Sequence, residues 1–317
     1  MSGPARRSSL PLACAAALIA AAVSAQVGNP AGQSKFYAAG AASSLVEQGL
    51  ALAMPTDADA TAFQTVPNPG VRNVPNQAQA TTAPWVDSNA WRFQRGLQKV
   101  NYANLPPGSA PLAAAEAFAF GIDAILNADA ADVQELGKVL RFLKAQDQPR
   151  LPAMANIGIV DDGSPAMGEI LNMLTRRNLL YRVVTAPDRK LDLTVQLGTP
   201  DFPREATSNP SDFAARVRAK LGDDKRLVRL YGTSTGIAHL TGDGKRARLY
   251  LLSYSRNRSQ PSLRVRVLGR YQPGTFAAYG ALPDAKLTDV QNPDKTATEF
   301  SVPAFNTIAV IDLNPVK

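Results

Sequence analysis

Ala155-Asn-Ile-Gly-Ile-Val-Asp-Asp-Gly-Ser-Pro165 decides the fold class of this 317-residue chain. Residues 155–160 are a short apolar run, which is typical of a buried strand. Ser164 is placed to cap a helix and Pro165 to open it, because proline suits the first helical position. A second apolar run follows at residues 179–184. The order of strand, helix and strand predicts a parallel pair in a three-layer, Rossmann-like α/β domain.

Asp161 and Asp162 lie at the predicted carboxyl end of the first strand. Ligands collect at this place in open α/β sheets, and a carboxylate there could act as acid or base or bind a hydroxyl or a cation. The same acids, followed by Gly163 and Ser164, also form a good turn and helix cap. The spacing of Gly158 and Gly163 does not match a dinucleotide-binding fingerprint, so we expect no cofactor.

The last part of the chain predicts strands almost throughout. Short apolar or alternating runs are separated by turn residues, and residues 241–244, Thr-Gly-Asp-Gly, suit a hairpin turn. This pattern favours an antiparallel β-sandwich over residues 225–317. The predicted strands are residues 227–231, 236–240, 246–254, 263–268, 298–302 and 307–313.

The N-terminal residues predict export. Residues 1–25 combine two arginines, a short apolar core over residues 10–22 and a small-residue cleavage site at residues 23–25, as in a secretory signal. The apolar core is too short to span a bilayer. We therefore expect a secreted or periplasmic protein that does not cross the membrane.

The segment between this signal and the α/β domain looks loosely organised. Residues 36–54 are alanine-rich and could form one helix, whereas residues 55–84 are rich in Pro, Asn, Gln and Thr. Residues 26–84 are thus predicted to be an extended or partly helical arm, and residues 85–224 the α/β domain.

Cysteine and histidine usage excludes several kinds of site. The one cysteine, Cys14, would leave with the signal, so the mature chain has no thiol for catalysis, disulfides or a metal. The one histidine, His239, cannot build a histidine-cluster metal site alone, so no metal is expected. His239 lies in a predicted strand and is expected to be half-exposed. Hydrolytic chemistry would therefore rest on carboxylates.

Basic residues concentrate in the predicted sandwich. The chain has a formal charge of +8, and residues 245–270 contain eight basic residues and no acid. Arg246 and Arg248 would share one strand face, and so would Arg264 and Arg266. Such a patch could contact acidic polymers of a cell envelope, although a solvated outer sheet face is the alternative. No nucleic-acid motif accompanies it, so nucleic acid is not an expected partner.

Both tryptophans lie in one short stretch, Trp85-Val-Asp-Ser-Asn-Ala-Trp91. If this stretch is extended, Trp85, Asp87, Asn89 and Trp91 point to one face. Indoles stack on the C–H faces of sugars, and polar neighbours, including Arg92, bond to hydroxyl groups. These five residues are the candidate binding site for a polysaccharide or other glycan. The alternative is that the two indoles anchor a core.

Two helices are predicted after this stretch, over residues 110–126 and from residue 129 onward. Glu116 and Asp123 would lie on one face of the first helix, two turns apart. A carboxylate pair at the right separation could hydrolyse a glycosidic bond. The acids considered as candidate catalytic residues are Asp87, Glu116, Asp161 and Asp162.

Residues 105–317 resemble the C-terminal half of secreted β-galactosidase-like glycoside hydrolases. In that family a catalytic barrel is followed by a Rossmann-like α/β domain and a small β-sandwich. Only about 120 residues precede the α/β unit here, whereas a complete barrel needs about 250. The resemblance therefore implies the architecture and carries over no catalytic residue. It rests on Ile157-Gly-Ile-Val-Asp-Asp-Gly-Ser-Pro165, Arg177-Asn-Leu-Leu-Tyr-Arg-Val-Val184 and Arg246-Ala-Arg-Leu-Tyr-Leu-Leu-Ser-Tyr254.

Three functional hypotheses follow. The leading one is a secreted carbohydrate-binding or carbohydrate-active protein with a glycoside-hydrolase-like architecture and no necessary catalysis. The second is a carboxylate-dependent glycoside hydrolase. The third is a structural or assembly protein of the cell envelope, in which residues 26–84 wrap a partner subunit and a homo-oligomer is the candidate assembly.

Overall fold

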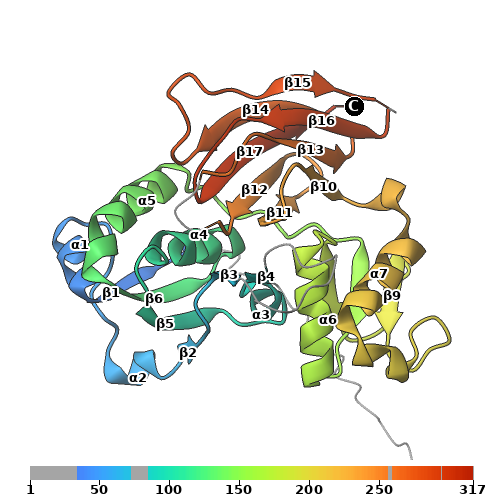
Figure 1. The fold of residues 1–317 in the computed structure, drawn as a ribbon, viewed down its shortest axis with the longest axis horizontal. Helices are drawn as coiled ribbons and strands as arrows, with labels where there is room; N and C mark the ends of the chain where they lie inside the picture. The colour runs from blue at the N-terminus through green and yellow to red at the C-terminus, as the bar shows by residue number, and fades with distance from the viewer. Residues whose placement is uncertain (1–33, 73–84, 256–258, 294, 317) are drawn as a thin grey trace, which may run out of the picture.

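The described residues form a mixed α/β fold in which parallel and antiparallel sheets lie in separate layers (Figure 1). The computed structural model describes residues 34–72, 85–255, 259–293 and 295–316. The predicted signal at residues 1–25 lies outside this part of the chain. Within the described part, no helix is long and apolar enough to cross a membrane.

The first parallel sheet has the strand order β1-β6-β5-β2. Helix α4 links β5 to the neighbouring parallel strand β6, and every residue of α4 is buried. Helix α5 packs on α4. The strands are β1 (Phe36–Gly40), β2 (Gln64–Thr65), β5 (Lys99–Leu105) and β6 (Asp123–Ala128), and the helices are η1 (Ala41–Ser43), α1 (Ser44–Glu47), α2 (Asp57–Ala60), α4 (Ala110–Phe120), η2 (Ala130–Asp132) and α5 (Val133–Ala145).

Strand β1 corrects the expectation of one helix over residues 36–54. It pairs in parallel with β6, and its Phe36 and Ala38 side chains are buried while alternate residues are more exposed. Gly40 then adopts a φ of 58° and ends the strand. The alanine-rich composition predicted a helix, but burial beside β6 overrides that weak local preference. Two strands from residues 26–84, β1 and β2, are thus built into the first parallel sheet.

Helix α4 is shorter than the helix predicted over residues 110–126. It ends at Phe120, and Gly121 caps it in the left-handed conformation at a φ of 75°. The chain then enters β6, so Asp123 lies on a strand. The expected helical face shared by Glu116 and Asp123 therefore does not exist.

The second parallel sheet has the strand order β8-β7-β9 and confirms the predicted strand, helix and strand unit. Ser164 caps α6, its hydroxyl accepting a hydrogen bond from the Met167 N–H at 3.1 Å. Residues 85–224 thus contribute strands to two separate parallel sheets rather than to one Rossmann-like sheet. The elements are β7 (Ile157–Val160), α6 (Pro165–Arg176), β8 (Tyr181–Val184), β9 (Leu193–Gln196), η3 (Arg204–Ser208), α7 (Pro210–Leu221) and η4 (Asp223–Lys225).

Two antiparallel four-stranded sheets complete the fold, with strand orders β11-β12-β17-β14 and β10-β13-β16-β15. The six strands predicted from residue 227 onward are present. Strands β14 and β15 were not predicted, since β14 contains Pro273 and Gly274 and β15 is exposed throughout. The strands are β10 (Val228–Tyr231), β11 (Gly236–Gly242), β12 (Ala247–Ser253), β13 (Leu263–Leu268), β14 (Tyr271–Ala278), β15 (Thr288–Gln291), β16 (Ala297–Val302) and β17 (Ile308–Pro315).

Strand β12 lies between two apolar clusters, and all its residues are buried. Leu249 and Leu251 belong to the cluster that fills the space between the two antiparallel sheets. Tyr250 and Leu252 belong to the cluster that contains α4 and the first parallel sheet. The alternation of side chains along a strand explains this division. A third apolar cluster lies between the second parallel sheet and the helices α6 and α7.

A ribbon of β3 (Gly70–Arg72) and β4 (Trp85–Asp87) leads into the short helix α3 (Ala90–Gln94). These elements lie between the first parallel sheet and α6 (Figure 1). Helix α3 contacts both α4 and α6. The double-tryptophan stretch therefore connects two parts of the molecule.

Candidate functional site

The double-tryptophan stretch changes from strand to helix after Asp87, so it is not extended over its whole length. The expected single face that would carry Trp85, Asp87, Asn89 and Trp91 is therefore not formed. Asn89 is buried, with 1% of its surface exposed, and its side chain donates to the Pro67 carbonyl oxygen at 2.8 Å. The two indoles therefore have different neighbours and do not form one surface.

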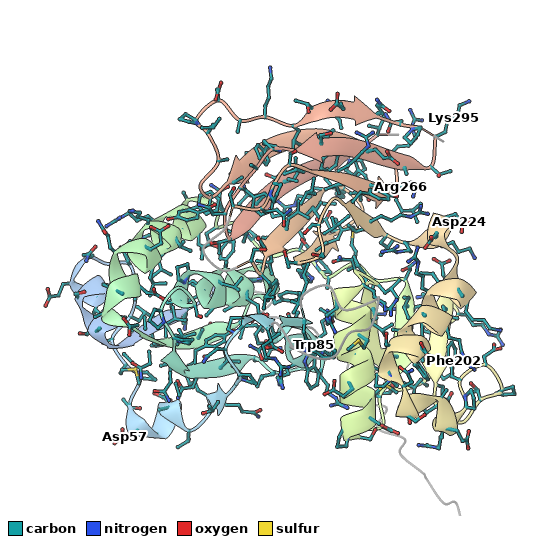
Figure 2. All side chains as sticks on the ribbon, viewed as in Figure 1. Asp57, Trp85, Phe202, Asp224, Arg266 and Lys295 are labelled. Atoms are coloured by element: carbon teal, nitrogen blue, oxygen red, sulfur yellow. The ribbon has the colours of Figure 1, made fainter. Side chains whose placement is uncertain are left out.

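Trp85 lies in the middle of the molecule, beside α6 (Figure 2). It is half-buried and packs on the apolar cluster of the second parallel sheet. The Arg176 guanidinium carbon stands 3.9 Å from a Trp85 ring centroid. On the neighbouring strand, Arg72 pairs with Asp87 through two hydrogen bonds of 2.5 and 2.9 Å. Trp85 and Asp87 are thus both engaged by arginines.

Trp91 lines an open cavity of about 590 Å³, which we call the Trp91 pocket. The edge of the indole rests on Gly168 of α6, where a Cβ atom would lie only 3.1 Å from the ring. The Arg92 guanidinium carbon lies 4.2 Å from a Trp91 ring centroid. The pocket is lined by Ala62, Gln64, Trp91, Arg92, Arg95, Gly96, Leu97, Gln98 and Lys99.

The Trp91 pocket is electropositive. Arg92 donates to the Asn89 side-chain oxygen at 3.1 Å, and burial lowers the pKa of its guanidinium, which nonetheless stays protonated at neutral pH. Lys99 lies 5.5 Å from the Phe63 ring centroid. Among the described residues, no carboxylate lies within ion-pair distance of Arg92 or Lys99. Neither cation therefore has an ion-pair partner among the described residues, although the charges of Glu116, Glu169 and Asp87 act on Arg92 from a distance.

Arg95 forms the wall between the Trp91 pocket and Asp161. Its guanidinium donates to both Asp161 carboxylate oxygens, at 2.6 and 2.7 Å. Burial works to raise the pKa of Asp161, but hydrogen bonds from Arg95 and the Gly163 N–H hold it below its ordinary value. Asp162 accepts from the Ser164 N–H at 3.0 Å. Both carboxylates thus accept hydrogen bonds from backbone N–H groups of the turn before α6.

Glu116 is fully buried at the centre of a hydrogen-bond cluster. Its carboxylate accepts from the Ser88 hydroxyl at 2.8 Å, the Asn89 N–H at 2.7 Å and the Tyr254 hydroxyl at 2.5 Å. The Tyr102 hydroxyl donates at 3.0 Å and the Asn89 side-chain amide at 3.3 Å, which makes five donors. Burial raises the pKa of Glu116, while these hydrogen bonds favour the charged form. The carboxylate is sealed from the Trp91 pocket.

The predicted basic face is neutralised by acids from neighbouring strands. Arg248 pairs with Asp312 opposite it on β17, with distances of 2.6 and 3.0 Å. Arg264 and Arg266 both pair with Glu299 of β16, at 3.0 and 3.7 Å. Arg246 in turn pairs with Asp243 in the hairpin turn, at 3.7 Å. The sequence window showed no acid because β16 and β17 come later in the chain.

His239 is buried rather than half-exposed, since β11 lies against α4. Its ring centroid is 4.2 Å from that of Phe120. Burial and the nearby Arg150 lower the pKa of His239 to about 3. Among the described residues, no group of three or more His, Cys, Asp or Glu side chains could hold a metal ion.

Sequence patterns did not identify the amide and lysine side chains of the Trp91 pocket. Gln64 lies on β2, a strand of only two residues that pairs with β5. Gln98 and Lys99 precede and open β5. Arg95 follows Trp91 by four residues, and residues four apart share a helix face. A helix in this stretch would therefore have predicted that Arg95 lies beside Trp91, whereas no local pattern predicts Gln64, Gln98 or Lys99.

The fold resembles a glycoside hydrolase. No protein-family model matches this chain, and no curated protein matches its sequence. The structure is similar to that of alpha-L-fucosidase isoenzyme 2 from Paenibacillus thiaminolyticus, with a TM-score of 0.51 and 8% sequence identity. The match covers 67% of this chain and 58% of the fucosidase chain, so the protein spans little more than half of that relative.

An alpha-amylase from H. orenii aligns with 71% of this chain and 56% of its own, at 8% identity. Its TM-score of 0.20 is too low to carry an argument. At such identities the fucosidase match establishes the architecture alone. That architecture is glycoside-hydrolase-like, as the sequence resemblance implied, without pointing to β-galactosidases in particular.

Proposed function

We propose that this protein binds an acidic glycan at the Trp91 pocket and does not hydrolyse it. The observation that supports the proposal is the joint presence, in one open cavity, of an indole, two side-chain amides and two cations that form no ion pair with another described residue. Its volume, about 590 Å³, falls within the range of about 300–1,000 Å³ that is common for small-molecule sites.

The chemistry of the pocket favours an acidic sugar over a neutral one. Arg92 lies across the Trp91 ring, so the indole holds its N–H donors in place. A guanidinium binds a carboxylate through two parallel hydrogen bonds, which suits the acid group of a uronic acid. Gln64 and Gln98 supply donors and acceptors for hydroxyl groups. Trp85 does not line this pocket, so the proposal does not require a chain long enough to reach both indoles.

The same pocket replaces the predicted arginine face as the contact for acidic polymers. Arg248, Arg264 and Arg266 already have carboxylate partners, and a polymer would have to displace them. Arg92 and Lys99 form no ion pair with another described residue, so an acidic polymer would displace no carboxylate from them.

Binding without hydrolysis is proposed because the four candidate acids have other roles. Asp87 pairs with Arg72, and Asp161 with Arg95. Glu116 is buried and accepts from five donors, and Asp162 accepts from the Ser164 N–H in the turn before α6. None of the four lines the Trp91 pocket. A hydrolase would need two carboxylates facing one sugar.

Calorimetric titration of the chain from residue 26 onward tests the binding proposal. The probes are oligogalacturonate and its neutral methyl ester. We expect the acid form to bind, with affinity falling as salt increases, and Arg92→Ala to weaken binding at least about tenfold, since charged hydrogen bonds contribute about 1.5–3 kcal/mol. Arg204→Ala is the matched control, because Arg204 is exposed and outside the pocket. Equal binding by Arg92→Ala and wild type would reject the site.

Aryl-glycoside assays test the second part of the proposal. We expect no turnover above that of the protein with all four acids replaced by alanine. Turnover that disappears on replacement of any one of Asp87, Glu116, Asp161 or Asp162 would instead establish a hydrolase.

We also propose that the protein is exported, which residues 1–25 predict. The mass of the mature protein checks this point. A chain that begins at Gln26 outside the cytoplasm supports export, and an intact N-terminus within the cytoplasm contradicts it.

A further inference from the structure

A second cavity, of about 470 Å³, lies where the first parallel sheet meets the antiparallel sheets. One side is formed by the loop after β5 and the start of α4, including Gly108 and Pro111. The opposite side is formed by the end of β12 and the segment before β17, including Ser253, Asn306 and Thr307. We call it the Ser253 cavity. Helix α4 and strand β12, which contact each other, both contribute residues to it.

The Ser253 hydroxyl, which lines this cavity, lacks a hydrogen-bond partner in the described part of the chain. Ser253 is the last residue of β12 and only 2% of its surface is exposed. A buried hydroxyl without a partner is destabilising, and native proteins seldom retain one without a reason. A ligand that places a hydroxyl in the cavity would satisfy it.

The other polar groups of the cavity suit the same kind of ligand. The side-chain amide of Asn306 and the hydroxyl of Thr307 line the cavity, and neither makes a side-chain hydrogen bond to another described residue. Amides and hydroxyls both donate and accept, as do the hydroxyl groups of sugars and polyols. Pro111 and Leu112 offer apolar contact for C–H groups.

An anion is disfavoured in this cavity although α4 begins there. The three N–H groups of Gly108, Ser109 and Ala110 already donate to the Asp132 carboxylate, at 2.6–3.1 Å. Glu135 adds a second carboxylate to the lining. The Tyr279 hydroxyl donates to it at 2.6 Å and lowers its pKa, so it stays charged at neutral pH. Two carboxylates repel anions and accept from hydroxyls.

We infer that the Ser253 cavity binds a neutral sugar or polyol, as a site separate from the Trp91 pocket. The inference rests on the orphaned Ser253 hydroxyl together with the unpartnered polar groups and two carboxylates around one cavity. It does not depend on the proposed binding of an acidic glycan elsewhere.

Saturation-transfer NMR and thermal-shift titrations test the inference with the mature protein. The probes are L-fucose, D-galactose, D-glucose and glycerol, with inorganic phosphate and sulfate as anionic comparisons. We expect at least one neutral probe to bind and both anions to fail. Ser253→Ala should weaken that binding at least about fivefold, since one hydrogen bond contributes about 1 kcal/mol.

Ser253→Ala should also fold as well as wild type, because it removes a buried hydroxyl that has no partner. Ser262→Ala is the matched control, as an exposed serine outside the cavity. Arg92→Ala should retain binding of the neutral probe, which separates this site from the Trp91 pocket. Binding of phosphate in place of sugars, no binding of any neutral probe, or unchanged binding by a folded Ser253→Ala would each overturn the inference.

Discussion

At the scale of single residues, Glu116 joins parts of the chain that are far apart in sequence. Its carboxylate receives donors from Ser88, Tyr102 and Tyr254, which lie before α3, on β5 and after β12. No local pattern predicts such a cluster, because its members meet only when the sheets pack. The structure therefore gives Glu116 a bonding role inside the fold, and its candidate role in catalysis stays a prediction.

Replacing Glu116 with alanine should strongly destabilise the fold. The Tyr102 hydroxyl and the Asn89 N–H would lose their acceptor, and the Ser88 and Tyr254 hydroxyls would keep only their contact with each other. Each unmet buried group costs about 1–3 kcal/mol. We expect the free energy of unfolding to fall by at least about 3 kcal/mol. Urea unfolding measures the change. Glu47→Ala, at an exposed position in α1, serves as the control and should change stability by less than about 0.5 kcal/mol. Similar losses in both variants would contradict the assigned role.

His239 should make stability fall on acidification. Its pKa drops from 6.5 to about 3 on folding, so the folded protein excludes a proton that the unfolded chain binds. The stabilisation is complete above the unfolded pKa and is lost as pH falls from about 6.5 towards 3. The slope approaches about 1.4 kcal/mol per pH unit.

Urea unfolding at about pH 7 and about pH 5 checks this prediction. We expect the wild-type protein to lose about 2 kcal/mol more than His239→Phe between these values. Phenylalanine keeps an aromatic ring against Phe120 and cannot titrate. Because the chain has one histidine, no second imidazole complicates the comparison. Parallel losses in both proteins would show that His239 is solvated.

At the scale of elements, α3 and α6 meet through a glycine. A Cβ atom at Gly168 would lie 3.1 Å from the Trp91 ring and 3.2 Å from the Arg95 guanidinium. Next to this contact, Arg95 also donates to the Ser164 carbonyl oxygen at 3.1 Å. The position of α3, and with it the Trp91 pocket, depends on this close approach.

Gly168→Val should separate the two helices. We expect a loss of about 1–3 kcal/mol in the free energy of unfolding, as in other overpacked contacts, and a change in tryptophan fluorescence. Glu169→Val introduces the same side chain at the next, exposed position and should leave the fluorescence unchanged. If both variants behave alike, the loss reflects helix propensity and not the contact with Trp91.

At the scale of the whole molecule, the antiparallel sheets complete the core of the first parallel sheet. Ile237, Tyr250, Leu252 and Ile308 belong to the same apolar cluster as α4. Helix α4 is buried on all sides and would expose much of its surface without them.

A chain that ends at residue 225 should therefore not fold cooperatively, even though it contains both parallel sheets. Near-ultraviolet circular dichroism and urea unfolding of residues 26–225 provide the test, beside the full mature chain. We expect weak tertiary signals and no sharp transition. A cooperative transition in the shorter chain would show that the first parallel sheet forms an independent core.

Local signals predicted much of the fold but little of the pocket. Ser164 and Pro165 mark the start of α6, and alternating apolar residues mark β12 and β13, because caps and strand patterns depend on neighbours in sequence. Strand β1 escaped prediction because its alanines resemble a helix, and β6 because it continues an apolar run after Gly121. Trp91 and Arg92 were already candidates from the sequence, whereas Gln64 lies at the pocket because two residues of β2 pair with β5.

The sequence by itself determined the elements with local signatures and the absence of a thiol from the predicted mature chain. Only the tertiary structure decided how the charged and aromatic side chains are used. The double-tryptophan stretch changes from strand to helix after Asp87. Glu299 and Asp312 form ion pairs with the arginines of β12 and β13. Arg92 and Lys99 form no ion pair with another described residue. The physical reason is that a side chain's burial and charge partners come from segments distant in the chain.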